Sequence, residues 1–359
     1  MIQHSFHPKV FLASLVLCLV MGSCSGQIDS KSSARQKLSS PPEQTAPVRP
    51  KDPMFFIEGQ LCQHLRKTFQ DSKGTLWFGT NVYDLMKYNG DSLQYIREEQ
   101  GFSGGRVTGI LEDDKGYLWV SSAQGLSRYD GTSFTTFTTK DGLRDHELWS
   151  LMRDSKGILW VGHNYGLSRF DGTTFTNFSV PKPELLETKT VFFADRITAI
   201  AEDVDGSLWL GTDGYGVCRF DGTSFTHLTT KDGLADNAIS ELMMDSKGQL
   251  WIGTFWGGLS KVDGKKITTF TTKDGISGSE VSALFEDDNG DIWFGVENNG
   301  VYKYDGESFL QFPQEQLSGA SILNIYKDKE NRFWFGGWGG LFRYDGNSFT
   351  PVTKDGPWQ

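Results

Sequence analysis

The sequence predicts an all-β fold, a seven-bladed β-propeller of four-stranded antiparallel blades, and three observations carry this prediction. With 42 Gly and 13% Phe, Trp and Tyr, the composition is typical of many short strands joined by tight turns. One tryptophan recurs at intervals of 42, 41, 49, 42, 42 and 41 residues, and a period of this length indicates propeller blades. The turns near each tryptophan also repeat their chemistry.

The tryptophans mark seven units: Trp77, Trp119, Trp160, Trp209, Trp251, Trp293 and Trp334. Six positions before each stands an aspartate: Asp71, Asp113, Asp154, Asp203, Asp245, Asp287 and Asp328. Three positions before it stands Gly in six units and Asn331 in the seventh. Asp can accept hydrogen bonds from turn amides, and Gly or Asn tolerates a positive φ. Because every unit repeats these residues, we interpret them as scaffold and not as a calcium or catalytic site.

The fourth unit shows the expected elements in order. Strands are predicted over Ile197–Asp203, Leu208–Thr212, Gly216–Phe220 and Phe225–Leu228, because each run is short and rich in β-branched or aromatic residues. The sequence does not decide how the ring closes, because residues 55–58 and residues 349–352 could each form the outer strand of the last blade.

The first 53 residues are expected to lie outside the propeller, which is assigned to residues 54–359. The apolar run Val10–Gly22 follows Lys9 and has the length of a secretory signal core. It ends in Met21-Gly22-Ser23-Cys24, which resembles a bacterial lipobox. We therefore predict a signal peptide over 1–23, lipidation of Cys24 and a flexible tether over 24–53; the alternative is ordinary cleavage near Ser25. The expected location is the bacterial cell envelope, lipid-anchored at the outer membrane, either periplasmic or surface-exposed.

Charge and cysteine content narrow the partners further. The net charge of −10 has the wrong sign for binding phosphate backbones, so no nucleic acid partner is expected. Only Cys62 and Cys218 remain in the body, three repeats apart, so no disulfide is predicted. No Cys or His cluster has metal-ligand spacing, and we expect neither metal nor cofactor.

The repeated segments DSKGQLWIGT and GLSRYDG resemble the two-component regulator propeller repeat family, and the resemblance covers all seven units. In that family such propellers form extracytoplasmic sensor domains of bacterial hybrid histidine kinases, many of which respond to carbohydrates. The family receptors continue into a further β domain, a membrane helix and a kinase, whereas this sequence stops at Gln359. The resemblance therefore implies a capacity to bind, without signalling in cis.

Residues that break the repeat are the candidates for function. The second-to-third and fourth-to-first connections of a propeller open on one face, and here they vary. Aromatic rings with amides and carboxylates suit a sugar, so we predict stacking surfaces and hydrogen-bonding groups for a glycan or an envelope protein. The stacking residues are Trp149, Tyr165, Tyr215, Trp256 and Trp338. The hydrogen-bonding residues are His163, Asn164, Asp213, Glu297 and Asn298.

Three alternatives stay open. In the first alternative, the loop aromatics only cover the blade tops and bind no ligand. A lyase or glycoside-acting enzyme would use His146 or His163 beside a carboxylate such as Asp145, Glu147 or Asp213. A structural adaptor would present the acidic outer surface to an envelope protein. We expect a monomer that binds without chemistry, and the insertion Val180–Phe193 as a lid or a partner contact.

Overall fold

The computed structural model describes residues 59–81, 85–96, 98–184, 190, 192–317 and 320–358. All of them belong to one unit of the chain, Gln44–Gln359. The predicted signal peptide, the lipidation site Cys24 and the tether 24–53 lie outside these residues. No helix in the described ranges is both long and apolar enough to span a membrane.

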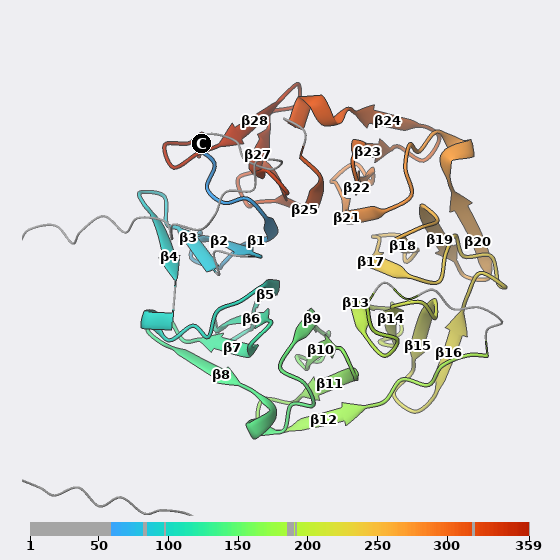
Figure 1. Cartoon of the computed structure of the whole chain (residues 1–359), viewed down its shortest axis with the longest axis horizontal. Helices are drawn as coiled ribbons and strands as arrows, with labels where there is room; N and C mark the ends of the chain where they lie inside the picture. The colour runs from blue at the N-terminus through green and yellow to red at the C-terminus, as the bar shows by residue number, and fades with distance from the viewer. Residues whose placement is uncertain are drawn as a thin grey trace, which may run out of the picture. The chain divides into compact units, whose positions relative to one another are not determined.

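The described residues form a seven-bladed β-propeller, as predicted, with seven four-stranded sheets in which consecutive strands pair antiparallel (Figure 1). We number the blades 1 to 7 in chain order. The first strands surround the central axis: β1 Leu65–Gln70, β5 Val107–Glu112, β9 Leu148–Arg153, β13 Ile197–Glu202, β17 Ile239–Met244, β21 Val281–Glu286 and β25 Ile322–Lys327. The second strands follow: β2 Leu76–Thr80, β6 Leu118–Ser122, β10 Leu159–His163, β14 Leu208–Thr212, β18 Leu250–Thr254, β22 Ile292–Val296 and β26 Phe333–Gly337.

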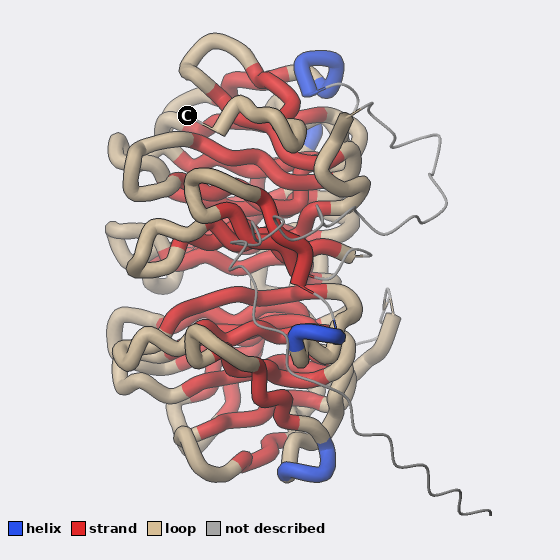
Figure 2. The backbone as a smooth tube through the Cα atoms, turned by 90° about the vertical axis from the view of Figure 1, so that its left-hand side faces the viewer, coloured by secondary structure: helices blue, strands red, loops and turns tan. Residues whose placement is uncertain are grey.

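The outer half of each blade consists of two further strands. The third strands are β3 Leu85–Tyr88, β7 Gly125–Tyr129, β11 Gly166–Phe170, β15 Val217–Phe220, β19 Leu259–Asp263, β23 Gly300–Tyr304 and β27 Gly340–Tyr344. The fourth are β4 Leu93–Ile96, β8 Phe134–Phe137, β12 Phe175–Phe178, β16 Phe225–Leu228, β20 Lys266–Phe270, β24 Phe309–Phe312 and β28 Phe349–Val352. Short 3-10 helices lie in fourth-to-first connections on one side of the ring (Figure 2): η1 Glu98–Gln100, η2 Thr139–Asp141, η3 Thr272–Asp274 and η4 Gln314–Leu317.

The repeated aspartate holds its turn as predicted and also anchors the tryptophan. In blade 5, one Asp245 oxygen accepts from the amides of Lys247 and Gln249, at 3.0 and 2.7 Å. The other accepts from the Trp251 indole N–H at 2.8 Å. The indole bond recurs in every blade. Asn331 takes the predicted positive φ, at 63°.

The repeated tryptophans join neighbouring blades. Trp251 meets Tyr304 of the next blade edge to face, with 5.8 Å between ring centroids. The Gly that follows in the same strand lets the blades converge near the axis: a Cβ on Gly253 would lie 2.7 Å from the Val281 carbonyl oxygen. These contacts between blades remove apolar surface from water, and this burial stabilises the ring.

Strand β28 supplies the outer strand of blade 7, which decides the question of closure for the described residues; the other candidate segment, 55–58, lies outside them. After β28, Trp358 stacks on Tyr88 of blade 1 at 4.1 Å and packs against Trp334 of blade 7 at 6.3 Å. Arg332 Nη1 donates to the Trp358 carbonyl at 2.7 Å. Trp358 therefore packs between the last and first blades and holds them together without a covalent bond.

Candidate ligand-binding site

A cavity of about 500 Å³ lies on the central axis and is lined by residues from all seven blades. Its walls are the beginnings of the first strands. In six of them the second residue falls out of register with the neighbouring strand. Such a bulge re-aims a side chain, and all six of these residues line the cavity. They are Arg66, Thr108, Trp149, Thr198, Ser240 and Leu323.

Hydroxyl side chains at these first strands tie adjacent blades together. Thr108 Oγ1 donates to the Leu148 carbonyl at 3.1 Å, and Ser282 Oγ donates to the Ile322 carbonyl at 2.8 Å. Thr108, Ser240 and Ser282 therefore belong to the scaffold. Arg66, Trp149, Thr198 and Leu323 make no such bond, and among them only Arg66 and Trp149 bring a charge or an aromatic ring to the cavity.

The position just before each first strand is a second source of unusual residues. It holds His64, Arg106, Glu147, Arg196, Ala238, Glu280 and Ser321 in blades 1 to 7. Four of these seven residues are charged, although the backbone there has no need of charge. Arg106, Arg196 and Glu280 were not among the predicted binding residues, although a comparison of this one position across the units identifies them.

Two of these arginines enclose Trp149. The Arg106 and Arg196 guanidinium carbons each lie 3.7 Å from the Trp149 ring centroid. Arg196 also lies 4.3 Å from the Phe192 ring centroid. We call Arg106, Trp149, Arg196 and Phe192 the arginine stack. Trp149 lines the cavity, and guanidinium groups lie over its ring, so stacking of a sugar on this ring stays a prediction.

Asn164 fixes the arginine stack. Its Oδ1 accepts from the Trp149 indole N–H at 2.9 Å and from Arg196 Nε at 3.1 Å. Its Nδ2 donates to Glu147 Oε2 at 3.1 Å, while Glu147 Oε1 pairs with Arg106 Nη2 at 2.9 Å. Burial opposes ionisation of Glu147, but these hydrogen bonds outweigh it and its pKa lies below the ordinary value. Asn164 is buried and supports the site through these bonds.

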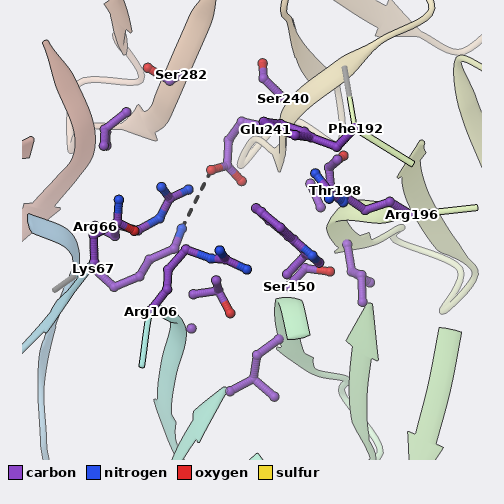
Figure 3. A pocket seen from close by; sticks show the side chains of 18 of the residues that line it. Arg66, Lys67, Arg106, Ser150, Phe192, Arg196, Thr198, Ser240, Glu241 and Ser282 are labelled. Atoms are coloured by element: carbon purple, nitrogen blue, oxygen red, sulfur yellow. Dashed lines mark ion pairs between the residues drawn. The ribbon is translucent and has the colours of Figure 1, made fainter. Parts of the chain in front are cut away.

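Charge is divided around the cavity. Basic residues come from blades 1, 2 and 4, and acidic residues come from blades 5 and 6. Figure 3 shows Lys67 reaching toward Glu241, with 3.7 Å between Nζ and Oε2. Burial lowers the pKa of Arg66 to about 10, helped by the charge of Arg106. Burial and the neighbouring carboxyl of Glu297 raise the pKa of Glu280 to about 8. This shift favours the protonated form of Glu280 relative to an exposed glutamate.

Two of the predicted hydrogen-bonding residues are fully buried, with no exposed surface. His163 Nδ1 accepts from the Tyr165 amide at 3.2 Å, and Nε2 lies 2.8 Å from Ser168 Oγ. Burial lowers the pKa of His163 to about 4, so the ring is neutral at pH 7. Asp213 Oδ2 accepts from the amides of Phe192 and Phe193, at 2.8 and 2.9 Å. Both side chains hold the connections in place, and direct ligand contact by them stays a prediction.

The other predicted residues lie on the connections around the cavity. Trp338 lines it, whereas Tyr165 and Trp256 are 52% and 43% exposed. Lys182 Nζ lies 5.3 Å from the Tyr215 ring centroid. Asn298 has a φ of 58°, and its amide donates to Ser321 Oγ at 3.2 Å. Glu297 acts on the cavity through Glu280.

The features considered for catalysis are weakly connected. His146 is exposed, and its Nδ1 lies 4.0 Å from Asp145 Oδ1. Cys62 and Cys218 are buried free thiols. Within the described ranges, no group of three His, Cys, Asp or Glu residues is placed to hold a metal ion.

Five segments match the family model for the two component regulator propeller: residues 101–124, 192–214, 233–256, 275–298 and 316–339. The chain carries repeats of this family, as its sequence predicted. The segments fall in blades 2 and 4 to 7; Arg66 of blade 1 and Trp149 of blade 3 lie outside them. No curated protein sequence matches the chain.

Solved structures share the fold. The extracellular domain of a putative hybrid two component system from B. thetaiotaomicron is 22% identical with a TM-score of 0.67, over 81% of this chain and 40% of that one. The chain thus spans less than half of that relative. A virginiamycin B lyase from Staphylococcus aureus, with quinupristin, is 16% identical with a TM-score of 0.61, over 77% and 93%. PorZ, a surface component of the type-IX secretion system of Porphyromonas gingivalis, is 15% identical with a TM-score of 0.59, over 82% and 48%.

Proposed function

We propose that this chain is a membrane-anchored, extracytoplasmic propeller of the sensor type that binds a glycan at its central cavity and performs no chemistry on it. The observation that carries the proposal is the cavity on the axis, whose charged and aromatic lining is not required by the blades. Repeats of the regulator propeller family and the likeness to an extracellular sensor domain support the same class. The presence of a ligand pocket where strands converge is typical of ring-shaped folds.

The lining suits a sugar in size and chemistry. A volume of about 500 Å³ falls within the ordinary range for small-molecule sites. Phe192, Phe255 and Trp338 offer apolar surface, and the surrounding charged groups offer directional hydrogen bonds to hydroxyl groups. This division of roles replaces Trp149 with Phe192 and Phe255 among the aromatic contacts.

Binding is favoured over turnover because the histidines considered for catalysis are poorly placed. His163 is buried, neutral and bonded at both nitrogens, so it has no free nitrogen for a substrate. His146 has only a distant carboxylate neighbour in Asp145. The similarity to a virginiamycin B lyase lies in the fold and brings no chemistry to this chain.

A glycan array with the purified protein tests this proposal. We expect binding to a restricted set of glycans, weakened at least tenfold in Phe255→Ala and Trp338→Ala. The matched control is Tyr117→Ala, which removes an aromatic ring at an Asp turn outside the cavity. Equal losses in all three variants, or no binding to any glycan, would contradict it.

Anchoring at the envelope is tested separately. If Cys24 is lipidated, Cys24→Ser should move the protein from the membrane fraction to the soluble fraction, and mass spectrometry should show acyl chains on wild type alone. Membrane association that persists in Cys24→Ser would remove the anchor from the proposal.

A protein partner is the second candidate, and exposed aromatic side chains on the connections favour it. Tyr165, Phe192, Phe193 and Trp256 are 52%, 56%, 48% and 43% exposed. Isolated exposed aromatics are common, but several on one set of connections suit an interface. Co-purification of an envelope protein lost in Tyr165→Ser and Trp256→Ser, yet retained in Phe255→Ala, would favour this function over glycan binding.

A further inference from the structure

The cavity is locally basic within an acidic protein. Arg66, Lys67, Arg106 and Arg196 line it, against the carboxyl groups of Glu241 and Glu280. The whole chain has a formal net charge of −10. A basic pocket in such a chain opposes the overall field, so its charge is concentrated locally and not a consequence of composition.

Two of the four cations are in ion pairs, and the other two keep N–H groups that a ligand can bind. Lys67 pairs with Glu241, and Arg106 pairs with Glu147. The charges of Glu241 and Glu280 act on Arg66, but no hydrogen bond or ion pair joins the Arg66 side chain to a described residue. Arg196 is 2% exposed, and its buried Nη1 has no hydrogen-bond partner among the described residues. A buried guanidinium N–H group without an acceptor destabilises the protein. A ligand oxygen that accepts a hydrogen bond from Arg196 Nη1 would recover this free energy.

The nearby carboxyl groups do not fill this role. Glu147 is held by Arg106 and Asn164, and Asp213 accepts from two backbone amides. Burial and the neighbouring Glu297 raise the pKa of Glu280, so its carboxyl group carries less negative charge than an exposed glutamate. Arg66 and Arg196, which lie on opposite sides of the cavity (Figure 3), are therefore the cations left for an anionic ligand.

The arginine stack holds these groups rigidly. Trp149 separates Arg106 from Arg196, and Asn164 accepts from Arg196 Nε, so little side-chain freedom is left to lose on binding. Guanidinium groups match the planar geometry of a carboxylate. A doubly charged phosphate is less suitable, since Glu241 also faces the cavity.

We propose that the ligand is an acidic oligosaccharide, whose uronic acid carboxylates bind to Arg66 on one side of the cavity and to Arg196 on the other, while its sugar rings rest on the aromatic lining. This inference rests on the proposed glycan-binding function and specifies the class of glycan. Trp149 and Asn164 are positioning residues that hold Arg106 and Arg196 in place.

Isothermal titration tests the inference with trimers of galacturonate, glucuronate and mannuronate, each compared with its methyl ester and its neutral counterpart. We expect at least one acid to bind, and its ester to bind at least tenfold more weakly. Arg66→Gln should weaken the acid tenfold to a hundredfold, because a hydrogen bond to a charged group is lost, and Arg66→Lys should lie between. Lys67→Gln should weaken it several-fold, and added salt should weaken it further.

Arg144→Gln is the matched control, since it removes an exposed arginine outside the cavity lining and should leave affinity unchanged. Acid and ester binding equally, neutral trimers binding alone, or acid binding unchanged in Arg66→Gln and Lys67→Gln would each overturn the inference and leave glycan binding intact. Failure of every acidic and neutral sugar, in the titration and on the array, would overturn both.

Discussion

Blade 3 anchors two indole rings with the same bond and uses them differently. Trp160 donates to Asp154 at 2.8 Å, and Trp149 donates to Asn164 at 2.9 Å. The first pair recurs in every blade and joins it to the next. The second pair has no counterpart among the described blades and holds two arginines at a cavity. The chemistry of a contact therefore does not distinguish scaffold from site, whereas its repetition does.

The largest expected difference between the two pairs is in stability. Trp160→Ala should lower the free energy of unfolding by about 3–5 kcal/mol, because a buried ring between blades leaves a cavity. Trp149→Ala should lower it by about 1–2 kcal/mol, since this ring lies at the edge of open space. Urea unfolding measures both. Equal losses would place Trp149 among the scaffold tryptophans.

Acid should expose the cost of burying His163. Its pKa is about 4 in the folded protein and 6.5 unfolded, so the unfolded chain binds the proton first. Stability from this group is complete above pH 6.5 and falls by about 3 kcal/mol as pH drops to 4. Glu280, with its raised pKa of about 8, acts in the opposite direction between pH 4.5 and 8.

The difference between wild type and His163→Gln isolates the histidine from Glu280. Urea unfolding at several pH values should show a shallower loss in the variant below pH 6.5. Parallel profiles for the two proteins would mean that His163 is accessible to protons in the folded state.

The anchors themselves should separate stability from binding. Asp154→Ala removes the acceptor for two turn amides and for the Trp160 indole, so we expect a loss of about 2 kcal/mol and unchanged ligand affinity. Asn164→Ala should cost about 1 kcal/mol but weaken the ligand about tenfold, because Arg196 loses its support. Titration and unfolding of both variants test this, and a reversed pattern would break the comparison.

The smallest effect is expected at the repeated turn. Asn331 has a φ of 63°, where the other units carry Gly. Asn331→Gly should change the free energy of unfolding by less than about 0.5 kcal/mol, whereas Asn331→Val should lose about 1–3 kcal/mol from backbone strain. Similar values for both variants would show that the turn does not depend on this conformation.

Repetition explains what could be predicted from the sequence. The repeated Trp and Asp residues predicted the strands and turns, because a pattern present in seven copies is easy to recognise. The indole bond to Asp was not predicted, since spacing does not show which way a ring nitrogen points. The repeat also contains the information needed to predict the arginines before the first strands, but the prediction rested on the loop aromatics.

The burial of polar side chains in the connections could not be predicted from one sequence. Phe192 and Phe193 bring their amides to Asp213, and this contact joins residues 20 and 21 positions apart through an insertion unique to blade 4. His163 is enclosed by Ser168 and Tyr165 of its own blade. A polar residue in a variable loop therefore suggested exposure, whereas tertiary packing had already satisfied it.

Hydrogen exchange of the protein, with and without the glycan that the array selects, tests the central claim most directly. We expect added protection at the starts of the first strands, around residues 64–67, 106–109 and 196–199, and unchanged exchange at the Asp turns 71–75 and 245–249. Protection confined to the Asp turns or to the outer strands would contradict a ligand site on the central axis.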